Sequence, residues 1–214
     1  MARLIKNETV ELFGKNATVP FINGCDNSYH PCQILADALT ILEKFGTLDV
    51  NLMYIGAKNN VFNSHVEFFS KMKKGTLYGL TPLVNETACG PDFYEEAKKS
   101  GHYIELDPAM SMEEAKEYAN KMDVLYTDTW VDMEFFNNPA YQKQKEETLA
   151  KMMPYQLNGD FTKDSKAIVF HDMPMQVGFE ISQDVVDKNL DHILDEAENR
   201  RHAEKAVMYT LLNS

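Results

Sequence analysis

Cysteine and basic residues are scarce in this chain of 214 residues, and both shortages narrow its possible functions. The three cysteines, Cys25, Cys32 and Cys89, are odd in number and lack the paired spacing of a zinc site, so we expect free thiols in a reducing compartment. Lysine and arginine total 21 against 33 acidic residues. The resulting net charge of -12 argues against nucleic acid or an anionic membrane as the main partner.

Long apolar runs are also missing. No stretch approaches the roughly 20 apolar residues of a membrane helix, and the first residues lack the apolar core of a secretory signal. We therefore expect a cytoplasmic protein. The length suits one large domain, or one domain plus part of another, and the 44% hydrophobic and 25% charged residues are typical of globular proteins.

From Thr47 onward, short apolar runs alternate with helical patterns. The predicted strands are 50–55, 77–80, 103–106, 124–127 and 167–171, and the predicted helices are 61–72, 91–100, 111–120, 140–152 and 196–212. Such alternation predicts an α/β fold with a doubly wound parallel sheet. Ligands of these sheets bind beyond the carboxyl ends of the strands. That rule selects the loops 56–60, 81–90, 128–136 and 171–179.

The first 45 residues supply too few strands for a sheet of their own. We predict short strands at 3–5 and 19–23, a helix at 8–14 and a longer helix from His30. One or two strands cannot provide the core area that a small domain needs. We therefore interpret 1–45 as the C-terminal remnant of a first α/β domain, 46–195 as a second α/β domain, and 196–214 as a terminal helix that returns toward the first.

The start of the helix at His30 carries side chains suited to an anionic or carbonyl-bearing ligand. The segment Asn23–Thr40 opens with turn formers and continues as an amphipathic helix, with Pro31 in its first turn. His30 and Gln33 are three residues apart and can project together from a helix start, where free N–H groups favour anions. The spacing alone leaves open whether His30 binds a ligand or only caps the helix.

Polar side chains also follow three predicted strands. The segment Gly56–Asn60 has one glycine where a dinucleotide fingerprint needs three, which disfavours a nicotinamide cofactor, and Asn60 can equally cap the next helix. Asp128 stands where a carboxylate either faces a ligand or merely ends the strand. Asp172 also follows a predicted strand. His171, beside it, is expected to pack behind the loop.

Taken in chain order, these segments resemble the motifs of the aspartate and ornithine carbamoyltransferases, and most closely those of the ornithine enzymes. The matching segments are His-Pro-Cys-Gln and Leu-Ala-Asp-x-Leu-Thr in 30–40, Gly-x-x-Asn-Asn at 56–60, Thr-Asp-x-Trp at 127–130, His-x-x-Pro at 171–174 and Glu-Asn-Arg at 198–200. The resemblance extends from Ala2 to Leu212. It implies transfer of the carbamoyl group of carbamoyl phosphate to an amine of an amino acid or diamine, with no metal or organic cofactor.

The resemblance also implies two sets of site residues. The set expected at carbamoyl phosphate comprises Arg3, His30, Gln33, Asp172, Met173 and Arg200. The set expected at the amine substrate comprises Asn60, Asp128, Asp132 and Met133. His30, at the carbonyl oxygen, and Asp172, near the reacting amine, are the expected catalytic residues.

Several positions depart from the family's motifs. Asp132 and Glu134 stand where the ornithine enzymes have Ser and Gly, and Asp172 and Met173 replace Cys and Leu. Together with Asp128, these acids predict a negatively charged pocket. Such a pocket favours ornithine or a related diamine and disfavours aspartate, whose carboxylates it would repel.

The family's Ser-x-Arg-Thr segment, which supplies most phosphate contacts, does not occur in this sequence. Because charge-assisted bonds to phosphate are worth about 1.5–3 kcal/mol each, we expect very weak activity from the isolated chain. We expect a homo-oligomer, a trimer by resemblance, or a complementing chain that carries the segment. The alternative is a non-catalytic or truncated relative that binds a cationic amine.

Overall fold

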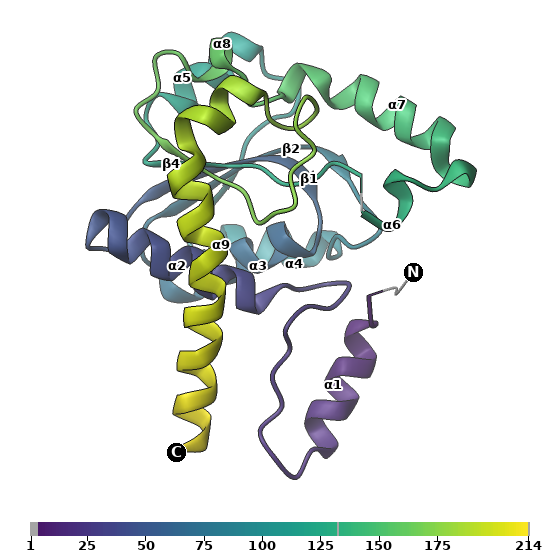
Figure 1. The fold of residues 1–214 in the computed structure, drawn as a ribbon, viewed down its shortest axis with the longest axis vertical. Coiled ribbons are helices and arrows are strands. Elements are labelled where there is room, and N and C mark those ends of the chain that lie inside the picture. The colour runs from purple at the N-terminus through teal and green to yellow at the C-terminus, as the bar shows by residue number, and fades with distance from the viewer. Residues whose placement is uncertain (1–3, 132, 214) are drawn as a thin grey trace.

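A five-stranded parallel sheet forms the centre of the computed structural model, which describes residues 4–131 and 133–213 (Figure 1). Its strands lie in the order β3-β2-β1-β4-β5. Their bounds are β1 Asn51–Lys58, β2 Thr76–Val84, β3 Tyr103–Glu105, β4 Val124–Tyr126 and β5 Ile168–Phe170. All five were predicted from the sequence, although β2 continues to Val84, past the predicted end at Leu80 and through Pro82.

The central strand β1 is buried along most of its length, which explains its continuous apolar sequence. Leu52 pairs in parallel with Leu77 of β2 on one side and with Val124 of β4 on the other. Because neighbouring strands run in parallel, the loops after β1, β4 and β5 all leave from one edge of the sheet.

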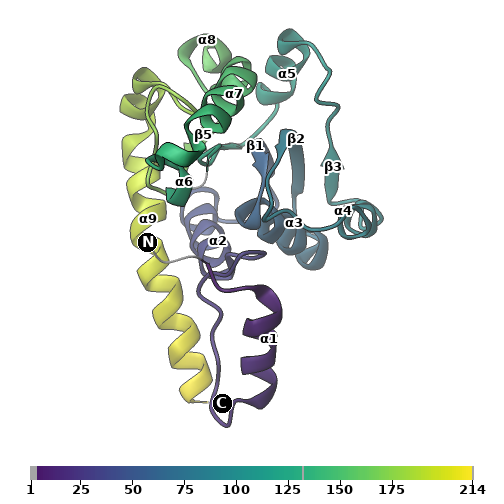
Figure 2. The same cartoon turned by 90° about the vertical axis from the view of Figure 1, so that its right-hand side faces the viewer.

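Helices cover both faces of the sheet, as the doubly wound prediction requires (Figure 2). Apolar side chains of α2 (Pro31–Phe45), α3 (Asn60–Met72) and α4 (Pro91–Lys98) form the core on one face. Side chains of α5 (Met112–Ala119), α8 (Gly159–Thr162) and α9 (Gln183–Leu212) form the core on the other. The remaining helical segments are α6 (Met133–Phe136), α7 (Gln142–Met152) and the 3-10 turns Pro139–Tyr141 and Met153–Tyr155.

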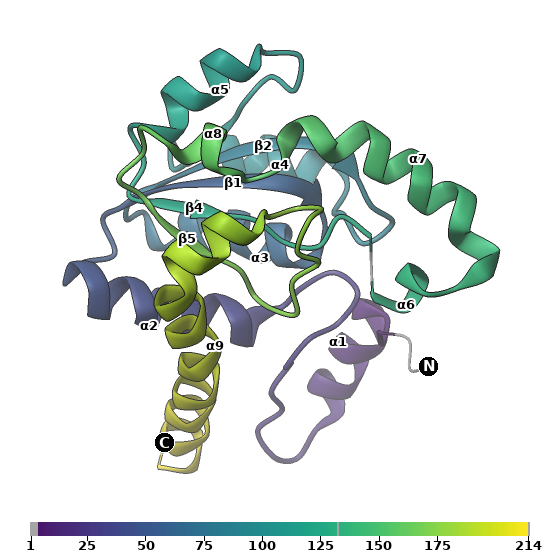
Figure 3. The same ribbon diagram turned by 45° about the horizontal axis from the view of Figure 1, so that its top comes forward.

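The N-terminal segment lies beside the body of the sheet rather than in it. Its helix α1 (Asn7–Asn16) buries no residue and extends on the same side as the C-terminal part of α9 (Figures 1 and 3). The predicted strand at 19–23 is wrong, and residues 4–5 of the strand predicted at 3–5 are also irregular. Neither segment pairs with a strand of the sheet, and an unpaired strand leaves its backbone groups unsatisfied.

The terminal helix α9 begins at Gln183, not at Glu196 as predicted. The predicted domain boundary between 195 and 196 therefore falls inside one continuous helix. Helix α9 packs against α2 and against β5, so it connects the His30 helix with the far edge of the sheet. No helix in 4–131 or 133–213 is long and apolar enough to span a membrane.

Candidate functional site

His30 and Arg200 meet where the start of α2 faces the middle of α9. Arg200 donates from Nη2 to Nε2 of His30 across 3.0 Å. A guanidinium can only donate, so Nε2 accepts and the ring proton is on Nδ1. That Nδ1 is buried and has no partner among the described residues. His30 is the N-cap residue of α2 by position, but its side chain makes no cap hydrogen bond and contacts Arg200 instead.

The environment of His30 keeps its ring neutral. Burial and the Arg200 guanidinium lower the pKa of His30 to about 4. A neutral ring with a free N–H donor suits a carbonyl oxygen that gains negative charge in a reaction, because the donor is already oriented and desolvated.

Gln33 lies in the first turn of α2, and hydrogen bonds orient its side-chain amide. Its Nε2 donates to Oδ1 of Asp37 at 2.9 Å and to Oε1 of Glu196 at 3.0 Å. Both amide protons are thereby used. Its Oε1 is buried with no partner among the described residues, and it can therefore accept a hydrogen bond from an N–H group of a ligand.

Two asparagines at the start of α3 have different roles. Asn59 is the N-cap: its Oδ1 accepts from the backbone N–H of Phe62, so the prediction that Asn60 caps this helix is wrong. Asn59 also donates from Nδ2 to Oδ2 of Asp128 at 2.6 Å. Asn60 donates to the carbonyl oxygen of Asp26 at 3.0 Å, so it connects α3 to the loop before His30.

Asp128 and Asp172 form a carboxyl pair at the ends of β4 and β5. Burial raises the pKa of Asp172 well above its usual range, and so does the Asp128 carboxylate, with which it shares a hydrogen bond. This shift favours a pair in which Asp172 keeps its proton and Asp128 does not repel a second full charge. Oδ1 of Asp172 is buried and unpartnered among the described residues, so the pair presents an acceptor for an ammonium group.

His171, as expected, packs behind this loop. It is fully buried, its Nε2 lies 3.2 Å from Oε1 of Glu180, and its Nδ1 accepts from the backbone N–H of Met173 at 3.0 Å. Met173 is 37% exposed and has a positive φ of 57°, which turns the chain back over His171. The ring therefore holds the loop in place.

The two halves of the predicted site lie close enough to influence each other. The Arg200 guanidinium and the Asp128 carboxylate both act on the pKa of His30 and on that of the half-buried Cys25 thiol, which Asn60 contacts at 3.4 Å. Burial, the largest cause, raises the pKa of Cys25 to about 11. Pairwise contacts and charge effects thus link His30, Arg200, Asn60, Asp128 and Asp172.

Three predicted residues cannot be placed in this way. Arg3 and Asp132 lie outside the described residues. Met133 begins the short helix α6, and the role expected for its side chain stays a prediction.

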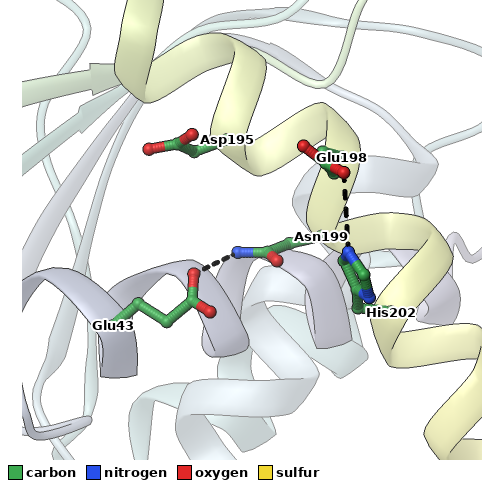
Figure 4. A pocket seen from close by; sticks show the side chains of 5 residues that line it. All are labelled: Glu43, Asp195, Glu198, Asn199 and His202. Atoms are coloured by element: carbon green, nitrogen blue, oxygen red, sulfur yellow. Dashed lines mark hydrogen bonds and ion pairs between the residues drawn. The ribbon is translucent and has the colours of Figure 1, made fainter.

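A separate open hollow lies between the end of α2 and α9 (Figure 4). It is lined by Glu43, Asp195, Glu198, Asn199 and His202, none of which was predicted as a site residue. Asn199 donates to Glu43 at 2.6 Å, and His202 lies 3.6 Å from Glu198. Within the described parts of the chain, no group of three or more His, Cys, Asp or Glu side chains is arranged to hold a metal ion.

Sequence reasoning missed the residues that support the site from behind. Asn59 could have been found, because Asn followed by an apolar helix is a cap signal. Asp37, His65 and Glu196 could not, because their contacts join α2, α3 and α9 across the fold. Oδ2 of Asp37 lies 3.3 Å from Nε2 of His65, and Oδ1 of Asp37 accepts a hydrogen bond from Gln33.

Comparison with known protein families agrees with the resemblance seen in the motifs. The aspartate/ornithine carbamoyltransferase Asp/Orn binding domain matches residues 48–211, and the carbamoyl-P binding domain of the same family matches residues 1–43. The ornithine carbamoyltransferase of Chlorobaculum tepidum is 35% identical over 219 residues, covering 100% of this chain and 60% of that protein. That of Pyrococcus horikoshii is 37% identical over 228 residues, covering 99% of this chain and 65% of that protein.

Solved structures show the same fold. The ornithine carbamoyltransferase of Thermus thermophilus matches with a TM-score of 0.77 and 31% identity, covering 99% of this chain and 65% of that one. The Pyrococcus furiosus enzyme matches with a TM-score of 0.78 and 34% identity, covering 97% and 64%. The chain thus spans less than two thirds of the length of these proteins. With its motifs, its fold and both family domains in agreement, the chain belongs to the aspartate/ornithine carbamoyltransferase family.

Proposed function

We propose that this chain takes part in carbamoyl transfer from carbamoyl phosphate to an amine of ornithine or a related diamine. The observation that carries the proposal is the juxtaposition of two polar units at one edge of the sheet. One is the His30–Arg200 contact, and the other is the Asp128–Asp172 pair. The first suits the carbonyl and phosphate of a donor, and the second suits an ammonium group.

On the donor side, three groups have complementary roles in this proposal. The Nδ1–H of His30 donates to the carbonyl oxygen, and Oε1 of Gln33 accepts from the carbamoyl amide. Arg200, whose side chain is 36% exposed, can leave His30 to bind phosphate with its permanently charged fork. The expected phosphate contact of Arg3 and the carbamoyl contact of Met173 belong to the same proposal.

On the acceptor side, the carboxyl pair holds and deprotonates the amine. The substrate arrives as an ammonium and gives one proton to the ionised member of the Asp128–Asp172 pair. The amine nitrogen then attacks the carbonyl carbon, a C–N bond forms, and the C–O bond to phosphate breaks. The second proton of the nitrogen passes to the leaving phosphate. Asn60, Asp132 and Met133 are proposed to hold the rest of this substrate.

The raised pKa of Asp172 favours a pair that keeps one proton, with a net charge of about −1 rather than the −2 of two free carboxylates. One ammonium is therefore matched at the pair. A second amine or an α-amino group of the substrate needs another partner, for which the proposal offers Asp132.

The proposal includes an assembly. We infer that a homo-oligomer, trimeric by family resemblance, or a second polypeptide supplies phosphate contacts like those of the Ser-x-Arg-Thr segment. We further propose that the protein works in the cytoplasm, and that residues 1–45 and 46–195 act as a donor-binding and an amine-binding unit.

A direct assay tests the function. The isolated chain is incubated with carbamoyl phosphate and ornithine, putrescine, lysine or aspartate, and the N-carbamoyl product is measured with and without a polypeptide of the N-terminal third of a relative. We expect very weak turnover alone, more with the added polypeptide, and a preference for ornithine or putrescine. Absence of product in both conditions, with ornithine still bound, would favour the alternative of a non-catalytic amine-binding relative. A preference for aspartate would refute the substrate proposal.

A further inference from the structure

Glu196 stands at the junction of the two halves of the site. It lies on α9, is fully buried, and accepts two hydrogen bonds from different parts of the chain. Its Oε1 accepts from the side chain of Gln33 at 3.0 Å, and its Oε2 accepts from the backbone N–H of His171 at 2.8 Å. One carboxyl group therefore touches the donor side and the loop that carries Asp172.

The contact with Gln33 decides which end of that amide faces the site. Oδ1 of Asp37 and Oε1 of Glu196 take both amide protons of Gln33, at 2.9 and 3.0 Å. A flipped amide would point its carbonyl oxygen at two carboxyl oxygens and leave its N–H groups toward the ligand. The other oxygen of Asp37, Oδ2, lies 3.3 Å from Nε2 of the buried His65, whose Nδ1 lies 3.0 Å from the carbonyl oxygen of Val61.

The contact with His171 holds the loop that carries Asp172. The backbone of His171 is tied to Glu196, and the His171 ring accepts from the backbone N–H of Met173 at 3.0 Å. Asp172 lies between these two anchored residues. The direction of its carboxyl group therefore depends on the place of the loop relative to α9.

We propose that Glu196 is a positioning residue that sets the Gln33 amide and the Asp172 loop together, so that a carbamoyl donor and an amine meet in one geometry. This inference rests on the proposed function. It assigns no contact between Glu196 and either substrate. In this inference, α9 keeps the donor side and the amine side of the site in a fixed relative position.

The protonation of Glu196 makes a sharp test possible. Burial and the Asp37 carboxylate raise the pKa of Glu196 well above its usual range, which favours the neutral acid, and its carboxyl group shares a hydrogen bond with Asp37. Glutamine has the shape of that neutral acid but only one acceptor oxygen. In Glu196→Gln, the amide can donate to Asp37 and accept from His171, and it then turns an N–H group toward Gln33.

Binding measurements separate the two contacts without requiring turnover. Phosphonoacetamide, a stable compound with the carboxamide and phosphonate of the donor, is titrated by calorimetry, and ornithine is then titrated with phosphonoacetamide at saturation. We expect Glu196→Gln to bind phosphonoacetamide at least about tenfold more weakly, with ornithine affinity within about twofold of wild type. We expect Glu196→Leu, which lacks both acceptors, to weaken both ligands. The control Glu198→Gln changes a 60% exposed carboxyl on the same helix and leaves both affinities unchanged.

The outcomes distinguish the inference from the proposed function. If the folded wild-type chain binds neither compound even with the N-terminal polypeptide of the assay above, the proposed function fails and the inference fails with it. If wild type binds both compounds and Glu196→Gln binds each with the same affinity as wild type, Glu196 is only a structural residue and the inference alone is overturned. An equal loss for both ligands in Glu196→Gln would indicate general loosening and would also overturn it. Because Glu196→Gln keeps the shape of the neutral acid, it decides the matter even if Glu196→Leu does not fold.

Discussion

The Asp128–Asp172 pair leads to a prediction about stability that can be tested without an activity assay. Asp172 stands where the ornithine enzymes' motif has a cysteine, and the fold favours its protonated form. Its usual pKa is near 3.8, and burial and the Asp128 carboxylate raise it well above that value in the fold. The unfolded chain therefore releases this proton at a lower pH than the folded chain.

The sign of the pH effect follows from that difference. Above about pH 4 the unfolded chain holds fewer protons at this position than the folded chain, so the free energy of unfolding falls as the pH rises. The decrease approaches 1.4 kcal/mol per pH unit for one group, and it ends where the folded group itself ionises. Asp172→Asn keeps the shape of the protonated acid and removes this dependence.

The assay is urea unfolding of wild type and Asp172→Asn at several pH values between 5 and 7.5. We expect the stability of the variant relative to wild type to rise with pH, by up to about 1.4 kcal/mol per unit. Asp191→Asn, at an exposed position of α9, is the matched control. Its free energy of unfolding should change with pH in the same way as that of wild type. Using the difference cancels the contributions of titratable groups that do not interact with Asp172. Parallel curves for wild type and Asp172→Asn would refute the shared proton.

Three further predictions concern neighbouring residues. The ring of His30 should titrate by NMR with a midpoint near pH 4, and a midpoint near 6.5 would mean that it is solvated. Asn59→Ala should lower the free energy of unfolding by about 1 kcal/mol or more, because the helix cap is lost and Asp128 loses a donor; urea unfolding measures this, and an unchanged value contradicts the cap. Arg200→Lys should weaken phosphonoacetamide binding about tenfold, since lysine cannot form a bidentate contact, whereas Arg201→Lys should not. Equal affinities for the two lysine variants in calorimetry would argue against Arg200 as the phosphate partner.

Periodicity was sufficient to predict the sheet and most helices. The apolar run of β1 and the helical spacing after His30 are local signals, and both predict elements that the structure contains. The predicted strand at 19–23 fails because apolar residues alone do not provide a pairing partner. The early start of α9 was missed although Ser182, its N-cap residue, and Asp184 in its first turn are ordinary start signals.

The candidate site was predictable only where side chains follow strand ends or helix starts. Asp128 and Asp172 could be expected near each other, because the carboxyl ends of neighbouring parallel strands share one edge. Their shared proton could not be expected, since it depends on burial. Glu196 lies 163 positions from Gln33 in sequence, and no local sequence pattern predicts that contact.

A ligand that joins both substrates gives the most direct test of the account. Ornithine with a phosphonoacetyl group on its δ-nitrogen should contact the His30 side and the Asp128–Asp172 side at once. Because the second half then binds intramolecularly, we expect its affinity to exceed that of phosphonoacetamide or ornithine alone by about 10²-fold or more. If calorimetry shows the joined compound binding no better than the tighter of its two parts, the two halves do not form one site.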